Sequence, residues 1–166
     1  MSGCFPPAGL GKPDAGLQVF IANRPPLDDY HQLAVVRPVV AGEIARIAAE
    51  TGNHWRKIFN VYAKLVYAWQ PAGFARWQDF RDQALLQAGS DEALLFTPPD
   101  LTGSSPALRL LLGKGYAQAL GMTAQLEWLD QDFARHHPSG VLLCPYFDYR
   151  QLSDEKIRRL VGYIRG

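Results

Sequence analysis

Polar and aromatic side chains that could bind a ligand follow three apolar runs of this chain. They lie in the segments 23–31, 97–105 and 145–153. Amides and carboxylates in such segments can hold a polar ligand or a water molecule, and exposed Tyr or Phe rings can stack on a nucleobase. The residue types therefore indicate a binding site that is assembled from several loops.

A fourth segment, "GNHWRKIF" at 52–59, places a histidine beside a tryptophan at the start of a helical pattern. Asn53 is a good N-cap residue, and Trp55 falls on an apolar stripe that we expect to be buried. His54 lies off that stripe. Two interpretations stay open for His54: a surface residue, or part of the wall of a pocket.

We expect no metal site and no cofactor. His136 and His137 are adjacent, but no cysteine or acid cluster near them completes a ligand set. The "GKG" at 113–115 falls within a helical pattern, whereas a phosphate loop would follow a strand. The two cysteines, Cys4 and Cys144, form neither a disulfide framework nor a zinc set, and they suit a reducing compartment.

The elements that position these groups follow from the spacing of apolar residues. Short apolar runs rich in Val, Ile, Leu and Phe predict buried strands, and apolar residues at helical spacing predict helices. Residues 122–140 fit either a strand or a helical turn. Strands are predicted at 17–23, 92–100 and 140–149, and helices at 39–52, 53–69, 74–89, 104–121 and from Ser153 to the end of the chain.

Strands that alternate with helices, each strand a continuous apolar run, are typical of a parallel sheet covered on both faces. We therefore predict a three-layer α/β/α fold with a short, mainly parallel sheet. Residues 17–166 form one domain, and residues 1–16, rich in Gly and Pro, form a flexible lead-in. In such folds the ligand site lies at the carboxyl ends of the strands, where the three polar segments begin.

Charge and hydropathy exclude several classes of protein. The chain has 166 residues and a net charge of +1, so no global field attracts nucleic acid or a membrane surface. There is no signal peptide pattern, and no apolar run reaches the roughly 20 residues that cross a bilayer. We expect a cytoplasmic protein with no membrane partner.

The order of four segments resembles the uracil-DNA glycosylase superfamily, most closely its mismatch-specific uracil/thymine-DNA glycosylase branch. The segments are "VFIANRPPL", "GNHWRKIF", "LGKGYAQALG" and "LSDEKI", and the resemblance spans most of residues 17–165. It implies a uracil-DNA glycosylase-like fold and a DNA-repair hydrolase. Such an enzyme extrudes a base into a pocket and cleaves its N-glycosidic bond. DNA or a nucleotide would be the partner.

The resemblance also implies roles for particular residues. Asn23, at the end of the first strand, would orient the attacking water, with Asp28 as an alternative base. Tyr30 and Phe147 would stack on the nucleobase, and Asn53 and His54 would line its pocket. Arg24 and Arg150 would bind phosphate.

One motif departs from the family. The sequence "PYFDYRQ" at 145–151 stands where the family has a proline-rich turn with a small residue and a glycine. Because of this difference, two alternatives to a glycosylase stay open. One is a catalytically inactive module on the same fold that binds single-stranded nucleic acid or a protein. The other is a small-molecule enzyme that shares only the layout of strands and helices.

Overall fold

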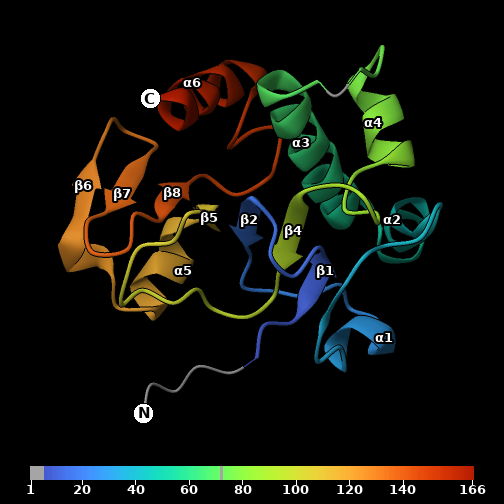
Figure 1. Ribbon diagram of the computed structural model, residues 1–166, viewed down its shortest axis with the longest axis horizontal. Coiled ribbons are helices and arrows are strands. Elements are labelled where there is room, and N and C mark those ends of the chain that lie inside the picture. Colours follow the sequence, from blue (N-terminus) through green and yellow to red (C-terminus); the bar gives the residue numbers. More distant parts are fainter. Residues whose placement is uncertain (1–5, 72) are drawn as a thin grey trace.

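The computed structural model describes residues 6–71 and 73–166 and has an α/β fold with one mixed sheet (Figure 1). The strands are β1 (Gly9–Gly11), β2 (Leu17–Phe20), β3 (Val36–Arg37), β4 (Glu92–Leu95), β5 (Leu108–Leu112), β6 (Leu126–Trp128), β7 (Ala134–His136) and β8 (Leu142–Cys144). The helices are α1 (Asp28–His31), α2 (Glu43–Thr51), α3 (Asn53–Trp69), α4 (Trp77–Gln83), α5 (Lys114–Ala119) and α6 (Asp154–Arg165), with a 3₁₀ turn at Thr123–Gln125.

The sheet has eight strands among the described residues, in the order β3-β1-β4-β2-β5-β8-β7-β6. The four strands β4-β2-β5-β8 are parallel to one another. Outside them, β1 pairs with β4, β7 with β8 and β6 with β7 in antiparallel fashion. The α/β class is therefore confirmed, but the prediction of a short, mainly parallel sheet is wrong, because antiparallel strands extend the parallel centre on both sides.

Strand β1 lies inside the segment 1–16 that we predicted to be a flexible lead-in. Leu10 is fully buried, and Gly9 and Gly11 lie against the backbone of β4, where a Cβ atom at Gly9 would collide with the Leu94 carbonyl. The glycines permit this close approach. The prediction of a flexible lead-in is therefore wrong for Gly9–Gly11. Residues 1–5 lie outside the described residues.

Strand β5 replaces the first half of the helix predicted at 104–121. Four of its five residues are buried between two parallel neighbours. A run of leucines fits a buried strand as well as a helix, and Gly113, at φ 94°, separates the strand from the short helix α5. Residues 122–140, left open by the sequence, contain the antiparallel strands β6 and β7. The helix predicted at 74–89 is shorter and spans only α4.

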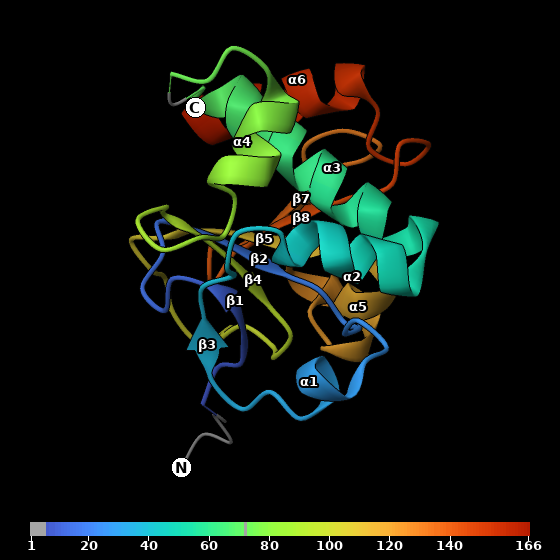
Figure 2. The same cartoon turned by 90° about the vertical axis from the view of Figure 1, so that its right-hand side faces the viewer.

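Helix α3 lies at the centre of one face of the sheet, and α2, α4 and α6 pack against it (Figures 1 and 2). The predicted apolar stripe of α3 is buried from Trp55 to Val66, which confirms it. The opposite face carries the short helix α5, whose Ala117 packs with Phe20 and Leu111. This second layer is thinner than the first and leaves part of the sheet accessible.

The C-terminal helix agrees with its prediction. Ser153 is the N-cap of α6, and its hydroxyl accepts a hydrogen bond from the backbone N–H of Lys156 at 3.4 Å. Ile157, Leu160 and Val161 form the buried face. Within the described part of the chain, no helix has the length and hydropathy needed to cross a bilayer.

Candidate functional site

The four parallel strands place their carboxyl ends at one edge of the sheet. The chain leaves β2 towards the helices on the α3 face, and it leaves β5 directly into α5 on the other face. Connections that leave neighbouring strands towards opposite faces create a crevice at the edge, which is the usual ligand site of open α/β sheets. By this rule, the fold favours a ligand site beside the carboxyl ends of β2 and β5.

A chain of hydrogen bonds joins three segments at this edge. The hydroxyl of Tyr146, which follows β8, donates to Oδ1 of Asn23, which follows β2, at 2.9 Å. The same hydroxyl lies 2.9 Å from Nε2 of His54 in the first turn of α3. The structure thus brings together two predicted site residues, Asn23 and His54, through a residue to which the sequence assigned no role.

The proton positions in the hydrogen-bonded chain Asn23–Tyr146–His54 follow from which of its atoms can donate. Burial raises the pKa of Tyr146, although its bond to Asn23 lowers it, so the phenol is neutral at pH 7. Its single proton points to Asn23, so His54 must donate its Nε2–H to the phenol oxygen. In neutral His54, Nδ1 is then an acceptor, and the second lone pair of Asn23 Oδ1 can accept a proton from a ligand or a water.

Arg24, predicted to bind phosphate, instead holds the loop after β2. Its Nη1 donates to the carbonyl oxygens of Tyr30 and Leu33, both at 2.8 Å. The guanidinium also lies 5.6 Å from the centre of the Phe96 ring. Three segments near the edge are therefore tied together by Arg24, and at least one of its nitrogens is occupied by the protein.

The stacking roles that the resemblance implies for Tyr30 and Phe147 are wrong, because both rings are fully buried. The Tyr30 hydroxyl donates to Oε2 of Glu43 at 2.6 Å. Burial and this hydrogen bond raise the pKa of Tyr30 to about 12. Phe147 packs edge-on against Tyr62, with the ring centres 5.6 Å apart. Neither ring has a face free for a nucleobase.

The remaining predicted residues are exposed. Asp28 and Asn53 lie in the first turns of α1 and α3, and no hydrogen bond among the described residues joins Asp28 to Asn23. Asn53 is not the N-cap of α3; Gly52 has that position, and no side chain caps the helix. The side chain of Arg150 lies at the surface, beyond the turn that the Asp148 carboxylate closes on the Arg150 N–H at 2.9 Å. Their proposed roles stay predictions.

A second aromatic residue near this edge, Tyr149, is 42% exposed. The amino groups of Lys57 and Lys64 lie 5.9 and 5.3 Å from its ring centre, within the range of cation–π attraction. Asn60 donates to its hydroxyl at 2.7 Å and in turn accepts from Arg81 at 2.8 Å. This arrangement holds an exposed ring beside two lysines, which also pair with carboxylates, Lys57 with Asp148 at 3.5 Å and Lys64 with Asp154 at 3.2 Å.

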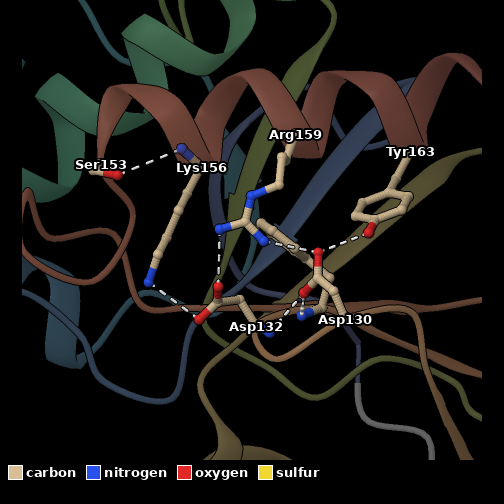
Figure 3. Close-up of polar contacts among 7 residues, drawn as sticks. Asp130, Asp132, Ser153, Lys156, Arg159 and Tyr163 are labelled. Carbon is tan, nitrogen blue, oxygen red and sulfur yellow. Dashed lines mark hydrogen bonds and ion pairs between the residues drawn. The ribbon is translucent and has the colours of Figure 1, made fainter.

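Two other polar clusters are structural. Figure 3 shows that Lys156, Arg159 and Tyr163 of α6 point to Asp130 and Asp132, in the loop between β6 and β7. Burial would raise the pKa of Asp130, but hydrogen bonds from Tyr163, two backbone N–H groups and Arg159 lower it to about 2. Through these hydrogen bonds and ion pairs, the two carboxylates hold α6 against the β6–β7 hairpin.

The second of these clusters contains a serine and a histidine. His136 Nδ1 lies 2.6 Å from the Ser139 hydroxyl, and its Nε2 lies 3.0 Å from Gln125 Oε1. Both residues are about 2% exposed or less, so no substrate can reach the hydroxyl. Among residues 6–71 and 73–166, no three His, Cys, Asp or Glu side chains gather in a way that could hold a metal ion.

Comparison with known proteins gives one finding. The model of a family of unknown function, DUF6942, matches residues 8–165. No curated protein and no solved structure matches the chain. The match covers the whole sheet and all the residues of the hydrogen-bonded chain.

Proposed function

The chain belongs to the DUF6942 family, whose function is unknown, and we propose that it binds a nucleobase or nucleotide at the carboxyl edge of its parallel strands. The observation that carries this proposal is the chain Asn23–Tyr146–His54. Three segments far apart in the sequence meet there, and they bring together the amide of Asn23, the hydroxyl of Tyr146 and the imidazole of His54. The Nδ2–H groups of Asn23 can donate to a carbonyl oxygen of the base, which leaves the second lone pair of Oδ1 for a water.

The same residues support hydrolysis of an N-glycosidic bond as the reaction. Asn23 Oδ1 accepts a hydrogen bond from water and orients it towards C1′ of the sugar. The bond between C1′ and the base nitrogen breaks and its electron pair goes to the base. The water oxygen forms the new bond to C1′, and the proton it loses balances the proton gained by the base.

Oligonucleotides test this proposal directly. Single-stranded and duplex substrates that contain uracil, hypoxanthine or an alkylated base are incubated with the protein, and abasic sites are measured. We expect Asn23→Ala to abolish cleavage and Tyr146→Phe to reduce it. Tyr67→Phe is the matched control, because the Tyr67 hydroxyl donates to the Phe74 carbonyl away from this edge. Cleavage that survives Asn23→Ala would contradict the proposed chemistry.

A second candidate function is a non-catalytic module for single-stranded nucleic acid, and the exposed ring of Tyr149 favours it. Aromatic rings beside lysines bind single strands by stacking and by charge. In this case binding weakens steeply with salt, persists in Asn23→Ala, and drops in Tyr149→Ala and Arg150→Ala. Absence of binding to any of the oligonucleotides, measured by fluorescence anisotropy at low salt, would refute both candidates.

A further inference from the structure

A cavity of about 530 Å³ lies on the sheet face opposite α3. Its apolar walls include Phe20 and Leu95, and its polar rim comes from the loop between β4 and β5 and from Arg109 of β5. The volume is within the range of small-molecule sites. We propose that this cavity binds a small phosphate ester whose phosphate lies against the loop and Arg109. The proposal goes beyond the proposed function and does not depend on it.

Arg109 supplies a buried positive charge that makes no ion pair among the described residues, although the Asp100 carboxylate lies near enough to attract it. Its side chain belongs to a residue that is only 6% exposed, and no carboxylate of the described residues lies within ion-pair distance of it. Its guanidinium donates instead to three backbone carbonyls, those of Asp100 at 2.7 Å, Gly103 at 3.0 Å and Ser139 at 2.6 Å. Carbonyl dipoles compensate a buried cation less fully than an anion does, so the site favours negative charge.

The guanidinium also keeps donors that the protein does not use. Of its five N–H groups, three make the carbonyl contacts. The Nε–H has no acceptor among the described residues, yet no buried side-chain nitrogen of those residues lacks a partner. The Nε atom is therefore not wholly buried, and Arg109 lines the cavity, so we infer that this N–H is available to a ligand there.

The loop adds further donors to the same rim. Gly103, Ser104 and Ser105 line the cavity, and their backbone N–H groups donate to no acceptor among the described residues. Ser105 Oγ accepts from the Ala107 N–H at 3.2 Å, which leaves its own proton free to donate. Consecutive backbone N–H groups bind an anion where a turn presents them on one side, and a guanidinium beside them strengthens the site.

The cavity also selects against some ligands. Pro7, Pro13 and Pro98 also line the cavity and are exposed, so a ligand with an apolar group next to its phosphate fits better than a free ion. Asp100 also lines the cavity and opposes an anion, although its Oδ1 is engaged by the N–H and hydroxyl of Thr102 at 2.9 and 2.6 Å. The opposing charge makes Asp100 a useful probe of the ligand's sign.

Phenyl phosphate is a suitable probe, with inorganic phosphate and phenol as its two halves. Calorimetry should give saturable binding of phenyl phosphate that is tighter than either half, and NMR should show shifts of the amides of residues 103–105. Ser104→Asp places a carboxylate on the exposed loop and should weaken binding about tenfold or more, from one repulsive charge at close range. Asp100→Asn keeps the acceptor for Thr102 and should tighten binding about threefold or more.

The control variant is Thr123→Asp, which adds the same charge at an exposed residue outside the cavity lining and should leave binding unchanged. Arg109 is left intact, because it holds the loop and Ser139. Asn23→Ala should also have no effect, which separates this site from the carboxyl edge. Absence of saturable binding, or binding that is indifferent to Ser104→Asp, would overturn the proposal.

Discussion

Replacing Tyr146 with phenylalanine tests whether three segments are held together at the carboxyl edge of the sheet. The change removes one oxygen atom and keeps the ring. That oxygen donates to Asn23 at 2.9 Å and lies 2.9 Å from His54 Nε2. Both partners would lose a hydrogen bond, and Asn23 would keep an acceptor that the protein no longer satisfies.

The expected cost follows from the two contacts. A hydrogen bond contributes about 0.5–1.5 kcal/mol to the free energy of unfolding. His54 is exposed and regains water, so its contact lies at the lower end of that range, whereas Tyr146 and Asn23 are half-buried. We therefore expect Tyr146→Phe to lower the free energy of unfolding by about 1–2 kcal/mol. Most of that loss belongs to the bond with Asn23.

Urea denaturation of the single and double variants isolates that bond. In a double-mutant cycle of Tyr146→Phe with Asn23→Ala, the stability loss of the double variant should differ from the sum of the two single losses by about 1 kcal/mol. In the cycle of Tyr146→Phe with His54→Ala, the deviation should be about 0.5 kcal/mol or less. Tyr67→Phe paired with Asn23→Ala is the control, and its two losses should add.

Additive losses for Tyr146 and Asn23 would refute the hydrogen-bonded chain on which the proposed function depends. A loss below about 0.3 kcal/mol for Tyr146→Phe alone would lead to the same conclusion, because a half-buried hydroxyl with two partners cannot be that neutral.

Three further variants test the fold. Asp130→Asn should lower the free energy of unfolding by about 1–2 kcal/mol at pH 7; the pKa of Asp130 is lowered to about 2, so this difference should shrink in urea titrations as pH falls below about 4. Gly9→Ala should cost about 2–3 kcal/mol by thermal unfolding, because the new methyl group meets the β4 backbone, whereas Gly115→Ala, with open space around it, should not destabilise. Phe147→Ala should cost about 3–5 kcal/mol without loss of oligonucleotide binding per folded molecule.

Much of the fold could be predicted from the sequence, because its main elements have strong local patterns. The long stripe of α3 and the Ser153 cap of α6 are both as expected. Strand β5 could not be predicted, because its four leucines around Arg109 fit two periodicities and only its parallel neighbours decide between them. The strands β1 and β3, at one side of the sheet, have three and two residues, too few to show any period.

The location of the candidate site was also within reach, through the rule that loops after parallel strands share one edge. Asn23 and His54 lie there in the structure. The individual roles could not be predicted so well, because alternation along "PYFDY" shows that neighbouring side chains point in opposite directions but not which set points outward. The structure turns Phe147 inward and leaves Tyr146 at the rim.

Hydrogen-bonding capacity resolves that ambiguity better than periodicity does. A phenylalanine can be buried without any partner, whereas a buried tyrosine hydroxyl must find one. Of Tyr146 and Phe147, the tyrosine is therefore the residue to expect beside polar groups at the edge. Tyr30 obeys the same rule in the core, where its burial requires Glu43, and Glu43 in turn requires Arg37 at 2.9 Å. A tyrosine predicted to be buried thus predicts a polar partner, and at the carboxyl edge of this sheet those partners are the residues that can bind a ligand.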